Sequence, residues 1–184
     1  MAATSGDDIA SAAGISTRTV WRYFRSKESC VEPLLAESAY RFMASLRRWP
    51  LSSSFEDFLT EDLSASPPTP QDLADDIASV RIISLVRDEP ALRASWLMVC
   101  GRAEHAFAPI IARRLDLPSD DFRVSLSAAT ATAAVRVVHE EISIGAVAGA
   151  REYTLDDVVT QLGRAIRSSS NEPICDPRPQ RSLL

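Results

Sequence analysis

Apolar residues recur along this chain at intervals of three and four, the spacing of one face of an α-helix, and the alternation typical of a β-strand is nearly absent. Prolines, glycines and capping residues divide this pattern into segments. We predict short helices over 6–13, 17–24 and 55–63, and longer ones over 26–49, 70–87, 91–115, 119–147 and 155–168. The predicted fold class is therefore all-α, with about eight helices.

Local signals indicate where the first helices begin and end. Thr4 or Ser5 is in the position of an N-cap, and Gly14 ends the first helix. Ser16 is in the position to cap the second helix. Pro33 falls inside the third predicted helix, where we expect it to bend the helix or to remove a hydrogen bond.

The composition is that of a globular protein from a reducing compartment. Hydrophobic residues make up 46% and charged residues 24% of the 184 residues, which are ordinary fractions for a soluble domain. The three cysteines are widely spaced and predict no disulfide framework. No apolar run has the length of a membrane span, and the first residues do not resemble a secretory signal. We expect a cytoplasmic protein without a membrane partner.

Charge divides the chain unevenly. The net charge is −5, but residues 1–50 carry seven basic and five acidic side chains, whereas residues 51–184 carry thirteen basic and twenty acidic ones. A small basic end on an acidic body predicts contact with a polyanion at that end.

The first two helices have the lengths and the short connection of a helix-turn-helix, in which Gly14-Ile15-Ser16 forms the turn. Val20 and Phe24 lie on one face of the second helix, and we expect Ile15 to fill the turn.

The opposite face of the second helix carries Thr17, Arg18, Trp21 and Arg22, and no carboxylate. Such a face suits the major groove of DNA, because Arg donates two hydrogen bonds to guanine and Thr or Trp contacts the thymine methyl group. The plain alternative is a solvated basic face.

Lys27 is the only lysine of the chain, and the prediction places it in the first turn of the third helix. The helix dipole disfavours a cation there. We therefore interpret Lys27 as a phosphate contact, with Tyr23 as another candidate.

At this point the stretch TSGDDIASAAGISTRTVWRYFRSKESCVEPLL, residues 4–35, resembles the N-terminal DNA-binding region of the TetR family of bacterial repressors. The resemblance is carried by the T-S opening, D-I-A, A-G-I-S, T-V-W-R-Y-F and S-K-E. It implies that Thr17, Arg18, Trp21 and Arg22 approach bases of a palindromic double-stranded operator, and that Thr4, Tyr23 and Lys27 hold phosphates.

One departure from the family pattern concerns the start of the chain. The family places a further helix before the T-S element, where it packs across the back of the helix-turn-helix, and here Met1 stands only three residues before Thr4. We therefore expect a DNA-binding domain whose first family helix is missing, so that the given chain is either shortened or a poor DNA binder.

The resemblance also implies a small-molecule site in the helices after residue 55, for a largely apolar effector. The alternative is that these side chains simply form the core. The candidate pocket residues are Phe55, Phe58, Ile82, Leu85, Trp96, Val99, Arg102, His105 and Phe107.

The predicted helix 119–147 is apolar over much of its circumference, so it is either central in one chain or part of a subunit interface. We favour an interface, because the resemblance implies a homodimer held by a four-helix bundle. The predicted interface residues are Val124, Ala131, Val135, Val138, Ile142, Val158, Leu162 and Ile166.

No catalytic, cofactor or metal motif is present, so we do not expect an enzyme. We divide the chain into a DNA-binding region with its connecting helix over 1–49, an effector-binding and dimerisation domain over 50–170, and a flexible tail over 171–184. The predicted function is a transcriptional repressor that an effector releases from its operator. The alternative is an all-α sensor or dimerisation protein that does not bind DNA.

Overall fold

The computed structural model describes residues 4–178, and across this range the chain forms helices and no strand. The predicted all-α class is confirmed. The eight α-helices are α1 (Gly6–Ala13), α2 (Thr17–Tyr23), α3 (Glu32–Arg48), α4 (Phe55–Ala65), α5 (Pro70–Ile83), α6 (Pro90–Leu115), α7 (Phe122–Val147) and α8 (Leu155–Ser169), and one 3-10 helix, η1, covers Glu28–Val31.

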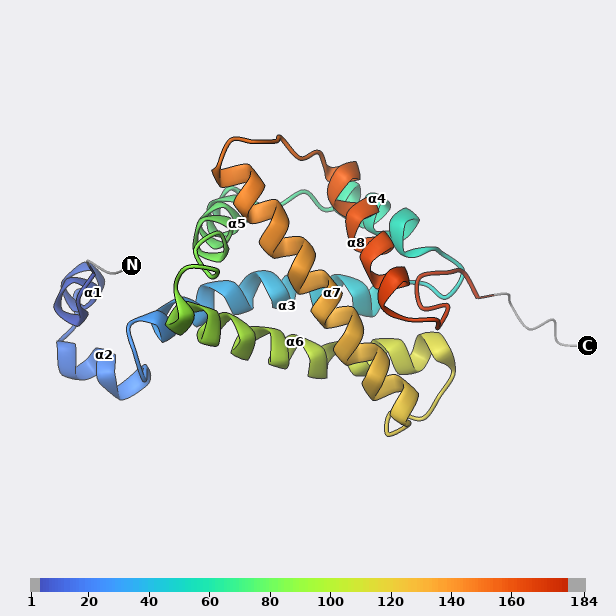
Figure 1. The fold of residues 1–184 in the computed structure, drawn as a ribbon, viewed down its shortest axis with the longest axis horizontal. Coiled ribbons are helices and arrows are strands. Elements are labelled where there is room, and N and C mark those ends of the chain that lie inside the picture. The colour runs from blue at the N-terminus through green and yellow to red at the C-terminus, as the bar shows by residue number, and fades with distance from the viewer. Residues whose placement is uncertain (1–3, 179–184) are drawn as a thin grey trace, which may run out of the picture.

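The helices form a projecting end and a larger body (Figure 1). The short helices α1 and α2 pack against each other at one end. In the body, α3 lies along α6, while α7 packs against α5, α6 and α8 and connects them. Helix α4 lies against α8 at the end of the body far from α1.

Side-chain caps explain where many of these helices begin. Capping boxes join Ser5 with Asp8 at α1 and Thr154 with Asp157 at α8, and the Ser16 side chain accepts a hydrogen bond from the Thr19 amide at α2. Each cap satisfies an amide that the helix itself leaves unpaired. Helix α1 ends at Gly14, whose φ of 66° is the left-handed conformation that glycine adopts without strain.

The prediction of one continuous helix over 26–49 was wrong. The chain forms η1 first and begins α3 at Glu32, so that Pro33 stands in the first turn of the helix. An amide in the first turn has no partner within the helix, so Pro33 removes no hydrogen bond there. Lys27 therefore precedes a 3-10 helix and does not lie in the first turn of a long α-helix.

Buried side chains gather in two clusters. The larger one joins the ends of α3 and α6 to α4, α7 and α8, and it contains Trp49, Phe55 and Phe58 with ring centroids 5.4 and 6.3 Å from Trp49. The smaller one joins the beginnings of α3 and α6 to the end of α5, around Leu35 and Trp96. None of the helices within residues 4–178 is long and apolar enough to cross a membrane.

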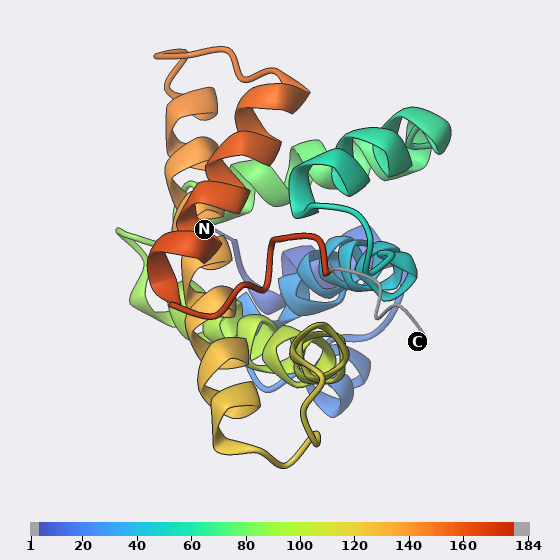
Figure 2. The ribbon, with the colours of Figure 1, turned by 90° about the vertical axis from the view of Figure 1, so that its right-hand side faces the viewer.

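The segment 171–178, predicted as part of a flexible tail, packs across the far end of the body (Figure 2). Ile174 and Cys175 are fully buried, and the Phe55 amide donates to the Cys175 carbonyl at 2.9 Å. This part of the tail prediction was wrong, because two apolar side chains complete the larger cluster. Residues 179–184 lie outside the described range.

The contacts of Arg114 hold this segment in place. Its buried guanidinium donates to the carbonyls of Pro50 at 2.7 Å, Ile174 at 3.0 Å and Asp176 at 2.5 Å, and it stacks 3.7 Å from the Trp49 ring. Desolvation lowers the pKa of Arg114 to about 10, so the side chain remains charged at neutral pH.

Candidate functional site

The projecting end is a helix-turn-helix with a small core of its own. Ala10 on α1 and Val20 on α2 are buried, and Phe24 is partly buried. Ile15 is 44% exposed and does not fill the turn, contrary to the prediction. Because α1 and α2 pack mainly on each other, the position of α2 depends on this small set of contacts.

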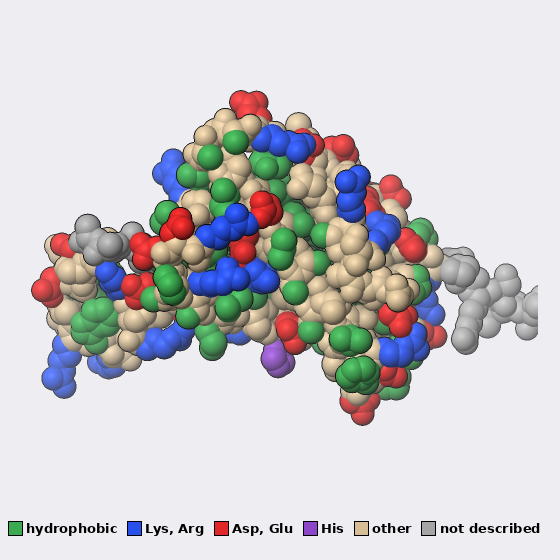
Figure 3. Space-filling view, viewed as in Figure 1, with side chains coloured by type: hydrophobic (Ala, Val, Ile, Leu, Met, Phe, Trp, Pro, Cys, Tyr) green, Lys and Arg blue, Asp and Glu red, His purple; other side chains and the backbone are tan. Residues whose placement is uncertain are grey.

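The outer face of α2 is basic and accessible. Arg18 and Arg22 are exposed, and Figure 3 shows Lys and Arg side chains along the edge of the projecting end. The Arg22 guanidinium lies 4.9 Å from the Tyr23 ring and donates to the Tyr23 hydroxyl at 3.1 Å. Tyr23 thus restrains the direction of Arg22 on the protein surface.

Two members of the predicted face interact with α1. The Thr17 hydroxyl donates to the Asp7 carboxylate at 2.6 Å, so a carboxylate from α1 lies beside this face. The Trp21 indole packs on Gly6, where a Cβ atom would overlap the ring. Trp21 is still 44% exposed, so its outer part remains accessible.

Lys27 connects the segment after α2 with the beginning of α1. Its Nζ donates to the Thr4 carbonyl at 3.1 Å, which brings together two of the predicted phosphate contacts. Tyr23, the third, is 69% exposed at the end of α2. Thr4 and Lys27 are thus joined to each other, and Tyr23 is accessible at the last residue of the helix that carries the basic face.

A buried carboxylate connects the projecting end with the body. Glu32 at the start of α3 accepts hydrogen bonds from Arg25, which follows α2, and from Arg102 on α6 at 3.4 Å. Arg102 was predicted to line the effector pocket, and the structure places its guanidinium in this ion-pair network. Through Glu32, α6 is joined physically to the segment that carries α2.

A largely apolar cavity lies inside the body between α3, α5, α6 and α7. It leaves a volume of about 80 Å³ open to the centres of water-sized molecules. Its apolar lining comprises Leu35, Ala39, Phe42, Met43, Ile83, Trp96, Val99, Ala103, Phe107 and Val135. Helix α6, which contributes Val99 on the cavity side, carries Arg102 of the Glu32 network as well.

Polar atoms are few in this cavity. The hydroxyl oxygens of Ser79 on α5 and Thr132 on α7 are buried and have no hydrogen-bond partner. Arg136 also lines the cavity, and its guanidinium donates to the buried Glu140 at 2.8 Å. Glu140 accepts a further hydrogen bond from the Trp96 indole at 3.1 Å.

Besides Arg136, two titratable groups lie at the cavity wall, and both are uncharged at neutral pH. Desolvation lowers the pKa of His139, although the Asp76 carboxylate opposes this shift. Desolvation also raises the pKa of the Cys100 thiol to about 12. The cavity thus presents a neutral imidazole and a protonated thiol, and a protonated thiol is a weak nucleophile.

Only part of the predicted pocket lines this cavity. Trp96, Val99 and Phe107 do so. The other predicted residues do not line it, because residues close in sequence point to different places: Phe55 and Phe58 lie in the larger core cluster, Ile82 is partly buried beside the smaller one, Leu85 is exposed, and His105 is exposed with Nδ1 2.8 Å from the Gly101 carbonyl.

Sequence reasoning missed the contributions of α3, α5 and α7. His139 precedes Glu140-Glu141, a sequence typical of a polar helix face, yet it lines the cavity. Ser79 and Thr132 carried no signal in the sequence, because a lone hydroxyl residue in a helix is common.

The predicted dimer-interface residues face inward. Val124, Ala131, Val138, Leu162 and Ile166 are buried in the core of one chain, and Val135, Ile142 and Val158 are partly buried against it. Most of their surface is therefore used in the packing of one chain.

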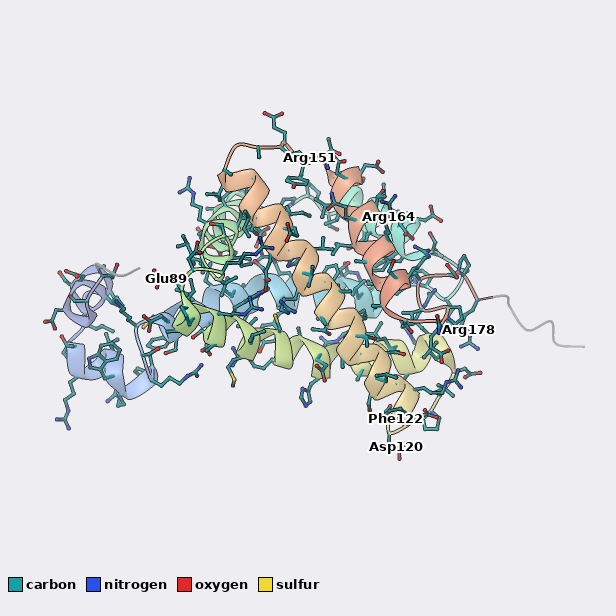
Figure 4. All side chains as sticks on the ribbon, viewed as in Figure 1. Glu89, Asp120, Phe122, Arg151, Arg164 and Arg178 are labelled. Atoms are coloured by element: carbon teal, nitrogen blue, oxygen red, sulfur yellow. The ribbon has the colours of Figure 1, made fainter. Side chains whose placement is uncertain are left out.

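The opposite side of α7 carries a second apolar stripe. Phe122 is 76% exposed, Leu126 50%, Val137 48% and Val147 53%, and their spacing places them on one helix face. Figure 4 shows Phe122 projecting from the start of α7. This outward stripe, Phe122, Leu126, Val137 and Val147, has no cover within residues 4–178.

Within the part of the chain that the structure describes, no group of His, Cys, Asp and Glu side chains is arranged to hold a metal ion. Comparison with protein families finds two matches. The family model described as bacterial regulatory proteins, tetR family, matches residues 1–34, and the model described as MftR C-terminal domain matches residues 71–167. Among curated proteins, none matches this chain.

Proposed function

Because the chain belongs to the TetR family of bacterial regulatory proteins and is a DNA-binding transcriptional regulator, we propose that it acts as a repressor which a small molecule releases from its operator. The observation that carries this proposal is the exposed basic face of α2 at one end of the molecule, with an apolar cavity in the body behind it. We propose no catalytic activity.

In this proposal Arg18 and Arg22 contact bases in the major groove. Thr17 and Trp21 lie on the same face, but their contacts with Asp7 and Gly6 also hold α2 against α1. Thr4, Tyr23 and Lys27 contact phosphates at the edges of the face. Since the Lys27 ammonium donates to the Thr4 carbonyl, it also keeps the start of α1 beside the segment after α2.

The effector is proposed to occupy the cavity between α3, α5, α6 and α7. Val99 and Arg102 lie on the same helix, so a displacement of α6 by a ligand also moves the Arg102 end of the Glu32 network. Arg25 lies at the other end of that network, directly after α2. Ligand binding then favours one position of the recognition helix over another, which is the differential interaction that a population shift requires.

The protein is proposed to act as a homodimer through the outward stripe of α7 together with α8. A palindromic operator presents two half-sites, and a two-fold symmetric dimer places one α2 helix in each of two successive major grooves, about 34 Å apart. This interface lies on the side of α7 opposite to the residues first predicted.

The test is a measurement of DNA binding with variants of α2. Duplexes are selected from a random pool by the protein, and affinity for a selected duplex is measured by fluorescence anisotropy over a range of salt concentrations. Arg18→Ala and Arg22→Ala are each expected to weaken binding by about 1–3 kcal/mol on the selected duplex and much less on random DNA. Arg81→Ala, an exposed arginine on α5, is the control and leaves affinity unchanged.

Lys27→Ala separates phosphate from base contacts. It is expected to weaken binding to both duplexes and to lower the slope of log affinity against log salt by about one. Equal losses on selected and random DNA for the arginine variants would reassign Arg18 and Arg22 to phosphate contacts. If the wild-type protein selects no duplex from the pool, the repressor proposal is wrong.

A further inference from the structure

The hydroxyls of Ser79 and Thr132 stand out among the hydroxyls of the helices. Both residues are more than nine-tenths buried, both line the cavity, and neither hydroxyl has a hydrogen-bond partner. Other hydroxyls of the same two helices donate to a backbone carbonyl of the preceding turn. Thr130 donates to the Leu126 carbonyl at 2.9 Å, and Ser84, directly after α5, donates to the Arg81 carbonyl at 2.8 Å. A buried hydroxyl without a partner destabilises the folded protein, because the group loses its hydrogen bonds to water and gains none in exchange.

The charges at the cavity wall, in contrast, are already compensated. Arg136 is paired with Glu140, and Glu140 also lies 3.6 Å from Arg93 and accepts from Trp96. An anionic ligand would have to compete with Glu140 for Arg136, and a cationic ligand would meet Arg136 itself. His139 is neutral, so it offers a hydrogen bond and no charge.

The cavity therefore has unused hydrogen-bonding capacity and no unpaired charge. Transfer of a neutral hydroxyl or carbonyl from water into such a site is favourable only where it forms a hydrogen bond there. Transfer of an unpaired ion from water is far more costly. Its volume of about 80 Å³ is enough for several water molecules, which need roughly 10–15 Å³ each.

We propose that the ligand of this cavity is a small uncharged molecule with an apolar body and at least one hydroxyl or carbonyl group, which pairs with the hydroxyls of Ser79 and Thr132. We take this ligand to be the effector, and only that identification rests on the proposed function. The apolar body contacts Val99, Phe107 and their neighbours, and the polar group lies between α5 and α7.

Three matched probes test the chemical class. Benzyl alcohol, toluene and benzoate share one carbon skeleton. Benzyl alcohol carries a neutral hydroxyl, toluene carries no polar group, and benzoate carries a negative charge. Binding is measured by calorimetry and by shifts of methyl resonances in the protein, at a pH well above 6.5 so that His139 is neutral. Benzyl alcohol is expected to bind about 3- to 10-fold more tightly than toluene, the contribution of one neutral hydrogen bond, and benzoate to bind most weakly.

Isosteric variants assign the preference to the two hydroxyls. Ser79→Ala combined with Thr132→Val is expected to reduce the advantage of benzyl alcohol to less than about twofold, without loss of thermal stability in the free protein, because no hydrogen bond is removed. Thr130→Val is the matched control on α7, since its hydroxyl bonds to the Leu126 carbonyl, and it leaves the preference unchanged.

Several results would overturn the proposal: benzoate as the tightest probe, an advantage of benzyl alcohol that survives in the double variant, a clear loss of stability in that variant, or no binding by any of the three probes. None of these results concerns DNA. Failure of the protein to bind any duplex, with the probe preferences as expected, would instead contradict the proposed function and leave the ligand class in place.

Discussion

At the scale of single residues, Arg114 is a buried charge whose contacts join distant parts of the chain. Its charge is buried, and backbone carbonyls and the Trp49 ring surround it. Without the guanidinium, these buried carbonyls lose their donor and a cavity remains beside Trp49. The contacts of Arg114 are therefore a condition for docking of the segment 171–178.

We expect Arg114→Ala to lower the free energy of unfolding by about 3–5 kcal/mol, the range found when a buried charged network is broken. The neighbouring Arg113 is exposed and also donates to carbonyls, those of Arg47 at 3.0 Å and Trp49 at 2.8 Å. Arg113→Ala serves as the control and is expected to cost only about 0.5–1.5 kcal/mol. Urea unfolding measures both variants, and equal losses would contradict the importance of burial.

The sequence made some single-residue roles predictable and others not. Ser16 and Gly14 were assigned correctly, because a cap acts on amides and carbonyls within four residues along the chain. His139 and Ser79 were not found, because their role depends on which helices meet at the cavity. Arg102 was misplaced for the same reason: its partner Glu32 is far away in sequence.

At the scale of helices, two glycines inside helical segments differ in what surrounds them. A Cβ atom at Gly101 in the middle of α6 would meet nothing within 4 Å, whereas one at Gly163 in α8 would overlap the Glu56 carboxylate that pairs with Arg167. Both positions otherwise gain from alanine, because glycine weakens a helix interior by roughly 0.5–1 kcal/mol.

Gly101→Ala is therefore expected to raise the free energy of unfolding by about 0.5–1 kcal/mol. Gly163→Ala is expected to bring no gain, since Glu56 has to move away from Arg167. Chemical denaturation of the two variants side by side makes the comparison. A gain at Gly163 as large as that at Gly101 would show that Glu56 moves without cost.

Apart from α3, helix starts were predictable to within a few residues, but helix faces were not. Helix α7 has one apolar stripe through Val124 and Val138 and another through Phe122 and Val137, on opposite sides. A helix that is apolar all round gives no periodic signal that tells the core from an interface. We predicted the interface on the inward stripe, and in the structure this stripe packs against α6 and α8 of the same chain.

At the scale of the whole molecule, the two stripes of α7 make the proposed dimer testable with adjacent residues. Val137→Arg places a charge on the outward stripe and is expected to yield folded monomers. Val138→Arg places it in the core, where Val138 is 8% exposed, and is expected to unfold the chain. Sedimentation gives the mass and far-UV circular dichroism the helix content.

The wild-type protein is the reference in that experiment and is expected to sediment as a dimer at micromolar concentration. A wild-type monomer, or a Val137→Arg variant that remains dimeric, would remove the outward stripe of α7 from the interface. Unfolding of both variants would show that Val137 belongs to the core of one chain.

The contacts of Arg114 also have a consequence for the order in which the chain folds during synthesis. The guanidinium needs carbonyls from Pro50 near the start of the body and from Asp176 near its end, so the larger core cannot close until almost all of residues 4–178 have emerged from the ribosome. The contacts of the helix-turn-helix, in contrast, lie within residues 4–27, and the Lys27–Thr4 hydrogen bond is the one that spans this range. All of these residues leave the ribosome much earlier. The basic face of the helix-turn-helix is therefore exposed while the body is still an unfolded nascent chain, and the cell has to keep such intermediates from aggregating.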